Sequence, residues 1–165
     1  MSTKKGPVLV LFVCLGNHCR SPMAQAVLRH KAELAGLSHR VVVDSAGTSS
    51  YHIGEPPHSG TRKILSRNGI SWDGIVGRKI TGDDFETYDY IIGMDEENIK
   101  DLNAIAGAEH RDKIVLLSQF VAGAQWTAVP DPWYTGNYVL TYQLIDQGCS
   151  AIIDQVQRRE SCCEG

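Results

Sequence analysis

The chain has 165 residues, of which 42% are hydrophobic and 21% are charged, and its formal net charge is −3. This length suits one domain that buries about 68–70% of its unfolded surface and needs no disulfide bonds or structural metal for stability. Mixed charges give no basic face for nucleic acid and no acidic tail, so no nucleic-acid partner is expected. The apolar run over residues 7–13 is too short to span a membrane and has no cleavage-site pattern. Five cysteines without regular spacing argue against a secreted disulfide framework. We therefore expect a cytoplasmic protein with reduced thiols and no membrane partner.

The apolar, β-branched-rich run near the N-terminus stops abruptly at Cys14 and is typical of a buried strand. A polar loop follows and leads into a helix. We expect Ser21 as the N-cap of this helix and Pro22 as its first residue. The apolar pattern of the helix continues to about Gly36, which suits a helix stop.

Strand and helix patterns then alternate along the chain. Further strands are predicted over residues 40–44, 88–94 and 113–117, and helices over residues 58–68, 81–86, 95–106 and 138 to about 158. The segment over residues 45–57 is rich in Gly, Pro and small residues, and predicts a loop long enough to be functional. The alternation predicts an α/β fold, in which a single-domain four-stranded parallel sheet has helices on both faces and a phosphate-binding loop after the first strand. The domain is expected to cover residues 1–165, with a flexible tail over about 158–165.

The loop from Cys14 to Arg20 has the features of an anion site. The first amides of a helix have no intrahelical partner, and with the loop amides they can form a ring of donors. Five residues separate the thiol from the guanidinium, so both can converge on one phosphate, which the Arg fork can bind through two oxygens. Next to Arg20 and the helix N-terminus, Cys14 is expected to be largely thiolate near neutral pH, with the Ser21 hydroxyl donating to its sulfur. The sequence thus indicates a nucleophile aimed at phosphorus, at the carboxyl end of a strand where such folds bind ligands.

Residues 14–22, Cys-Leu-Gly-Asn-His-Cys-Arg-Ser-Pro, resemble the signature loop of the low-molecular-weight protein tyrosine phosphatases. Residues 44–48 (Asp-Ser-Ala-Gly-Thr), 93–98 (Gly-Met-Asp-Glu-Glu-Asn) and 129–134 (Val-Pro-Asp-Pro-Trp-Tyr) resemble family segments in the same order, so the resemblance covers nearly the whole chain. It implies hydrolysis of phosphotyrosine through a phosphocysteine on Cys14, with Arg20 holding the phosphate. It also implies that Asp131 protonates the leaving group and then activates water. The implied partners are tyrosine-phosphorylated proteins, with phosphate or other oxyanions as product or inhibitor. No metal or other cofactor is expected, because Arg20 and the amides supply the positive charge.

The resemblance also implies which residues surround the substrate. Around the phosphate these are the loop residues Leu15, Gly16, Asn17, His18, Cys19 and Ser21. Asn17 would also bond within the loop and to Ser45, which would support the loop. Tyr51, Trp133 and Tyr134 are aromatic residues on loops that would flank a phosphotyrosine ring. Trp133 occupies a position that is often Tyr in the family, which leaves Tyr134 as the candidate for regulatory phosphorylation within the pair.

Two of these roles compete with simpler interpretations. On the residues alone, Asp131 before a proline fits an Asx turn as well as it fits a general acid. Cys19 fits a reversible disulfide with Cys14, as the resemblance implies, or a small buried side chain. Cys162 and Cys163 fall in the predicted tail, where no function is expected.

His18 is the main departure from the family pattern. Tyrosine phosphatases of this family usually have Ile at this position, and the related protein-arginine phosphatases have Thr. A titratable ring at the lip of the loop could alter substrate choice or the pH profile, or could point to solvent. A zinc site built from Cys14, His18 and Cys19 is disfavoured, because no second ligand pair has zinc-like spacing. The other histidines, including His52 and His58, are expected on the surface or in loop packing.

Three other functions share some of these sequence features. A protein-arginine phosphatase is the nearest alternative, because of His18. An arsenate reductase resembles this loop but relays electrons through further cysteines, and none occurs between Cys19 and Cys149. A non-catalytic phosphate-binding module would be expected to have lost Cys14, Arg20 or Asp131.

Overall fold

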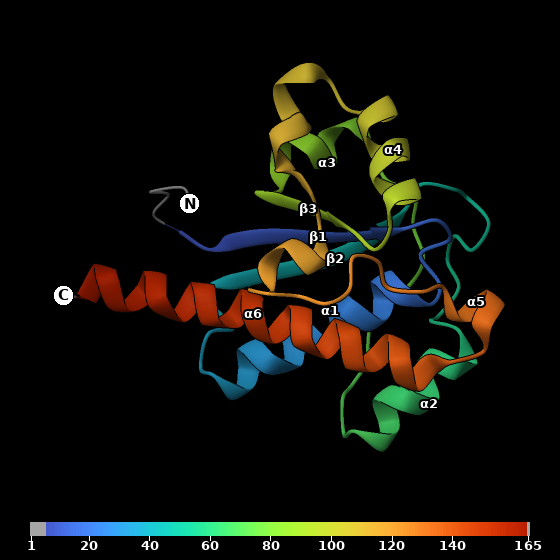
Figure 1. Cartoon of the computed structure of the whole chain (residues 1–165), viewed down its shortest axis with the longest axis horizontal. Coiled ribbons are helices and arrows are strands. Elements are labelled where there is room, and N and C mark those ends of the chain that lie inside the picture. Colours follow the sequence, from blue (N-terminus) through green and yellow to red (C-terminus); the bar gives the residue numbers. More distant parts are fainter. Residues whose placement is uncertain (1–5, 165) are drawn as a thin grey trace.

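The computed structural model describes residues 6–164 as a single α/β domain built on one parallel sheet (Figure 1). Its strands lie in the order β2-β1-β3-β4. Their bounds are β1 Val8–Cys14, β2 Val41–Gly47, β3 Tyr90–Gly93 and β4 Ile114–Leu116. All three strand pairs are parallel, with Cys14 opposite Gly47 at the carboxyl end of β1. The predicted four-stranded parallel sheet is confirmed.

Helices cover both faces of this sheet (Figure 1). One face carries α1 Arg20–Leu34, α2 Ser59–Arg67 and α6 Tyr138–Glu164, and the other carries α3 Gly82–Thr87 and α4 Glu96–Ile105. Two 3₁₀ helices, Ala108–Lys113 and Leu117–Phe120, flank β4, and the short α5 Pro132–Thr135 precedes α6. None of the helices within residues 6–164 combines the length and apolar character that crossing a bilayer requires.

The side chains of β1 alternate between two apolar clusters, because successive residues of a strand point to opposite faces. Val10, Phe12 and Cys14 join the larger cluster, with residues of α1 and α6. Leu11 and Val13 join the smaller cluster, on the side of α3 and α4. Burial on both faces explains why this strand is a continuous apolar run. It also places the Cys14 side chain on the α1 side of the sheet.

The start of the first helix differs from the prediction. Helix α1 begins at Arg20 with Cys19 at the N-cap position, where the side chain makes no capping hydrogen bond. Ser21 and Pro22 are therefore the second and third helical residues rather than the cap and the first. The Ser21 hydroxyl instead contacts Cys14 and Asn17, so tertiary bonds override its preference for capping. The stop at Gly36 is as expected, since this residue has a φ of +70°.

The end of the chain also differs from the prediction, because α6 continues to Glu164 rather than ending near Arg158. Arg158, Arg159 and Glu160 favour helices, and this part of α6 is also bonded to the residue that precedes β2. Nε of Arg40 donates to Oε1 of Glu160 over 2.8 Å. Cys162 is exposed on this helix rather than in an irregular tail.

Candidate active site

The loop between β1 and α1 has its carbonyl groups engaged by neighbouring segments. The oxygen of Cys14 accepts from the amide of Thr48 over 3.1 Å, and that of His18 accepts from the amide of His58 over 2.8 Å. The Thr61 hydroxyl donates to the oxygen of Cys19 over 2.9 Å. Within residues 6–164, the amides of residues 16–19 have no acceptor. These N–H groups, next to the start of α1, are therefore free to bind an anion.

Asn17 holds the shape of this loop. It is the only residue other than glycine between 6 and 164 with a positive φ, +50°, a conformation that Asn tolerates. Its Nδ2 donates to the hydroxyls of Ser21 and Ser45, each over 2.9 Å, and its Oδ1 accepts from the amide of Arg78 over 2.9 Å. The expected bond to Ser45 is thus present. The Asn17 and Ser21 side chains are buried behind the pocket wall, so they support the loop rather than line the pocket.

Gly47 allows β2 to approach the loop closely. A Cβ at this position would lie 2.9 Å from the carbonyl oxygen of Leu15 and 3.0 Å from the amide nitrogen of Asn17. Such contacts are too short for a side chain, so only glycine fits. This provides a physical reason for the Gly in the Asp-Ser-Ala-Gly-Thr segment.

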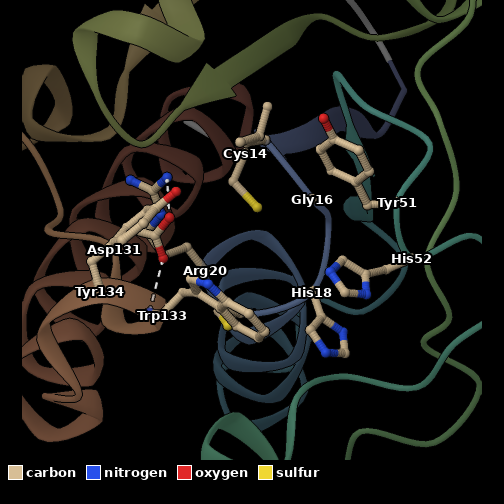
Figure 2. A pocket seen from close by; sticks show the side chains of 11 residues that line it. Cys14, Gly16, His18, Arg20, Tyr51, His52, Asp131, Trp133 and Tyr134 are labelled. Carbon is tan, nitrogen blue, oxygen red and sulfur yellow. Dashed lines mark hydrogen bonds and ion pairs between the residues drawn. The ribbon is translucent and has the colours of Figure 1, made fainter.

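Cys14 lies at the base of a pocket of about 290 Å³ and directs its sulfur into it (Figure 2). The Sγ atom is 3.0 Å from Oγ of Ser21. The side chain is only 3% exposed, so a reagent reaches the sulfur through the pocket. The Ser21 hydroxyl can donate to a thiolate at this position.

Arg20 is held at the side of the same pocket by three acceptors. Its Nη1 donates to Oδ2 of Asp95 over 2.7 Å and to the carbonyl of Val129 over 2.8 Å, and its Nη2 lies 3.5 Å from Oδ2 of Asp131. Burial lowers the pKa of this guanidinium, but attraction to Cys14 and the bond to Asp95 outweigh that effect, and the net pKa is raised. Arg20 is therefore a fixed cation.

Asp95 is a site residue that the sequence analysis did not identify. Its Oδ1 accepts from the amide of Asn98 at the start of α4, while its Oδ2 binds Arg20. The signal was available, because Asp95 comes two residues after the end of β3 and the carboxyl ends of parallel strands lie at one edge of the sheet.

Asp131 combines the two interpretations that the sequence left open. Its Oδ1 accepts from the amide of Trp133 over 3.1 Å, which caps α5 and makes the expected turn. Its Oδ2 faces Arg20 at the pocket wall. A carboxyl group fixed at this position is available to a ligand that occupies the pocket.

The three aromatic residues chosen from the sequence lie around the pocket mouth. Tyr51 stands on one side, and Trp133 and Tyr134 come from α5 on the other (Figure 2). They are 76%, 58% and 79% exposed, respectively, which is unusual for such large apolar groups. A flat aromatic ligand would find a face to stack against on each side.

Two histidines complete the rim. The rings of His18 and His52 stack at a centroid distance of 3.9 Å with an interplanar angle of 7°, and both rings line the pocket. His18 also meets His58 edge-on at 5.3 Å. Burial, followed by the neighbouring imidazoles, lowers the pKa of His18. Its ring packs against the loop over residues 48–57, which follows β2, and does not extend freely into solvent.

From the sequence, His52 was expected on the surface or in loop packing; the structure packs its ring against His18 and places it on the pocket wall, a position that was not predicted. The loop over residues 48–57 packs against the segment that precedes α3, and Gly77 in that segment allows the close approach. A Cβ at residue 77 would lie 2.1 Å from the carbonyl oxygen of His52. No local motif around His52 carries this information. His58 is the N-cap of α2: its Nδ1 accepts from the amide of Gly60 over 3.0 Å and lies 2.8 Å from the hydroxyl of Tyr138 at the start of α6.

Cys19 also lines the pocket, although its side chain is largely buried. Its Sγ lies 3.5 Å from the hydroxyl of Tyr138. Burial raises the pKa of this thiol to about 11, so it stays protonated near neutral pH and does not compete as a nucleophile. Cys14 and Cys19 are both free thiols in this structure.

Comparisons with known proteins agree with this geometry. A family model described as low molecular weight phosphotyrosine protein phosphatase matches residues 9–161. The chain is 46% identical over 153 residues to the low molecular weight protein-tyrosine-phosphatase YfkJ of Bacillus subtilis, covering 93% of this chain and 98% of that protein. It is 36% identical over 156 residues to PtpA of Staphylococcus aureus, which has the same description, covering 94% and 98%.

Solved structures give the same result. The crystal structure of YfkJ from Bacillus subtilis superposes with a TM-score of 0.90 at 45% identity, covering 94% of this chain and 98% of that one. The structure of DARP, a Drosophila arginine phosphatase, has a TM-score of 0.81 at 32% identity, covering 88% and 96%. The residues matched by the family model, 9–161, include every residue that lines the pocket.

Proposed function

The chain belongs to the low molecular weight protein tyrosine phosphatase family and is a phosphatase of that class, and from this premise we propose how its own residues carry the reaction. The proposal is a two-step hydrolysis of phosphotyrosine in proteins through a phosphocysteine on Cys14. The observation that carries it is the convergence of the Cys14 sulfur, the Arg20 guanidinium and the Asp131 carboxyl group in one pocket.

In the first step the Cys14 thiolate attacks phosphorus, the S–P bond forms, and the bond between phosphorus and the tyrosine oxygen breaks. Arg20 and the unpaired amides of residues 16–19 bind the non-bridging phosphate oxygens, where negative charge is held in the transition state. The protonated carboxyl group of Asp131 gives its proton to the leaving tyrosine oxygen. Ser21 donates to the sulfur and stabilises its anionic form.

In the second step water hydrolyses the phosphocysteine. Asp131, now a carboxylate, takes a proton from this water as its oxygen attacks phosphorus, and the S–P bond breaks to restore the thiolate. Inorganic phosphate leaves the pocket and, as product, competes with substrate. Each proton and bond is accounted for by the chain and water, so this mechanism needs no metal.

The walls of the pocket support phosphotyrosine as the substrate. Tyr51, Trp133 and Tyr134 offer aromatic faces at the mouth, and the sulfur lies at the base, so an extended aryl phosphate fits between them. Phosphoarginine is the second candidate, favoured by the similarity to the Drosophila arginine phosphatase and by the polar ring of His18 on the wall.

We propose the cytoplasm as the site of action. The mechanism requires Cys14 as a free thiol, and a reducing compartment maintains that state. The odd number of cysteines and their irregular spacing support this location.

The substrate assignment is tested by turnover of phosphotyrosine, phosphoserine and phosphoarginine peptides with a reductant and EDTA present. We expect phosphotyrosine to be preferred and Cys14→Ser to abolish turnover. Preference for phosphoarginine would overturn the substrate assignment and leave the mechanism in place.

The acid role of Asp131 needs a variant that keeps its capping bond. Asp131→Asn retains an acceptor for the Trp133 amide but has no proton to give. We expect its kcat/KM for phosphotyrosine, which reports on the first step and not on the hydrolysis of the phosphocysteine, to fall by roughly 10²–10⁴-fold. The loss should shrink for an aryl phosphate whose leaving group is acidic, because that group departs without a proton. Equal losses for both substrates would contradict the acid role.

A further inference from the structure

A second cluster of chemically active side chains lies on the rim of the pocket, beside the groups used in the proposed reaction. His18, His52 and Glu55 each offer one ligand atom, and these atoms lie within 4.8 Å of one another. His18 belongs to the phosphate-binding loop, whereas His52 and Glu55 belong to the loop over residues 48–57 that follows β2. The cluster therefore joins two segments that are separate in the sequence.

His18 contributes an independent observation. Its Nδ1 is buried without a hydrogen-bond partner. The backbone of Pro56 also lies near this ring, and with Nδ1 unpaired it is Nε2 that would donate to its carbonyl. A ring that donates through Nε2 keeps a lone pair on Nδ1. Metal-ligating histidines have this arrangement, in which the second nitrogen donates to a carbonyl or carboxylate.

We propose that His18, His52 and Glu55 bind one divalent transition-metal ion of the zinc class at the rim of the pocket. Two imidazoles and one carboxylate suit Zn²⁺ and its neighbours, and three protein ligands leave a fourth position open. This set differs from the Cys14, His18 and Cys19 set that the sequence spacing disfavours. The proposal goes beyond the phosphatase reaction and does not depend on it.

Binding requires a small rearrangement of the cluster. Ligand atoms bound to a tetrahedral Zn²⁺ at about 2.0–2.1 Å lie about 3.3 Å apart, closer than the present limit of 4.8 Å. The stacked rings of His18 and His52 must also turn so that their lone pairs converge. The χ2 torsion of histidine is broad, and Glu55 is exposed and free to move. His52 Nδ1 already contacts the Glu55 carboxylate, and the metal would replace the proton between them.

An ion at this position would act on the neighbouring pocket. It would cross-link the loop that carries the phosphate-binding amides to the loop that carries Tyr51. It would also place positive charge beside the path of an anionic substrate. The site is therefore a candidate for control of access to Cys14 by zinc.

The test separates this cluster from the thiols, which also bind zinc. The protein is the full chain without a polyhistidine tag, in the Cys14→Ser background, and the probes are Zn²⁺ by calorimetry and Co²⁺ by visible absorption. We expect one ion per chain, Co²⁺ d–d bands without a thiolate charge-transfer band, and a higher Tm with Zn²⁺. His18→Phe, which keeps a stacked ring, and Glu55→Gln should each weaken binding by at least about tenfold.

His39→Gln is the matched control, because His39 is an exposed histidine outside the cluster. It should bind Zn²⁺ as tightly as its parent. The proposal is overturned if Zn²⁺ does not bind, or if Co²⁺ shows a thiolate band. It is also overturned if His18→Phe and Glu55→Gln bind as tightly as His39→Gln. His18→Phe and Glu55→Gln both change side chains on the partly exposed rim of the pocket. Circular dichroism verifies that each variant is folded.

Discussion

Asn17 links the phosphate-binding loop to three other parts of the fold through its side chain alone. It bonds to Ser21 in α1, to Ser45 in β2 and to the amide of Arg78 in the segment before α3. It does so in a left-handed conformation with a φ of +50°. Position 17 thus requires a residue that tolerates a positive φ and a side chain that forms these hydrogen bonds. Substitutions can separate the two requirements.

Asn17→Ala removes the three bonds and also strains the backbone, whereas Asn17→Gly removes only the bonds. Removing the bonds leaves buried donors and acceptors without partners, so we expect Asn17→Ala to lose about 2–3 kcal/mol of unfolding free energy. Asn17→Gly should lose about 1 kcal/mol less, because glycine tolerates a positive φ. Both should lower kcat, since Ser21 and the loop amides lose their support. Denaturant unfolding and turnover measure these effects. Equal stability of Asn17→Ala and the parent protein would contradict the role given to this side chain.

The contact between α6 and the 3₁₀ helix Leu117–Phe120 depends on the absence of a side chain at Gly148. A Cβ there would lie 2.4 Å from Cγ of Leu117, in the larger core cluster. Helix propensity favours alanine over glycine by about 1 kcal/mol, but overpacking a core costs about 1–3 kcal/mol. The packing effect should therefore dominate.

We expect Gly148→Ala to be less stable than the parent protein by thermal or denaturant unfolding, with catalytic activity retained below the transition. The matched control is Gly82→Ala in α3, where a Cβ would meet no atom within 4 Å. That variant should be at least as stable as the parent. A stabilised Gly148→Ala would show that α6 and the 3₁₀ helix are not tightly packed at this point.

The long elements could be predicted from the sequence, because their apolar periods are several turns or a whole strand long. Of the shorter elements, α3 and β4 were predicted, within residues 81–86 and 113–117, but others were not. The 3₁₀ helices and α5 have only four to six residues each, too few to show a period. The first turn of α1 was misplaced for a different reason. Ser21 and Pro22 satisfy local capping rules, but the Ser21 hydroxyl is used by Cys14 and Asn17.

The candidate site divides in the same way. Cys14, Arg20 and Asp131 lie in contiguous motifs and were identified from them. His52 was not, because its position depends on how the loop over residues 48–57 packs at the carboxyl edge of the sheet. Gly77 permits that packing, and its role appears only in the structure. Asp95 was missed although its place just after β3 was a usable signal.

Arg78 connects three regions of the fold: the phosphate-binding loop, β2 and α3. Its guanidinium binds Asp44 of β2 over 3.0 Å and Asp84 of α3 through two bonds of 2.9 and 3.0 Å, while its amide binds Asn17. Burial would raise the pKa of Asp84, but bonds from Arg78 and from the Thr81 amide outweigh it, and the net pKa is lowered. This carboxylate therefore stabilises the fold while it is ionised.

The pH dependence of stability follows from that direction. Because the pKa of Asp84 is lower in the folded than in the unfolded protein, its contribution is complete above the unfolded pKa, about 3.9. It disappears as the pH falls through the folded pKa. We expect Asp84→Asn to lose about 1–3 kcal/mol near neutral pH and to show a shallower loss of stability in acid. The exposed neighbour variant Asp83→Asn should match the parent at every pH. Parallel pH curves for Asp84→Asn and the parent would contradict the role of this ion pair.

In the proposed hydrolysis, Cys14 carries the phosphoryl group between the two steps. The most direct measurement is rapid acid quenching of enzyme mixed with a phosphotyrosine peptide, followed by peptide mass spectrometry to locate the phosphoryl group. We expect a phosphocysteine at residue 14 that forms and decays at rates matching turnover, and none in Cys14→Ser. Phosphorylation at Cys19 instead of Cys14, or turnover without any phosphocysteine, would show that Cys14 is not the nucleophile.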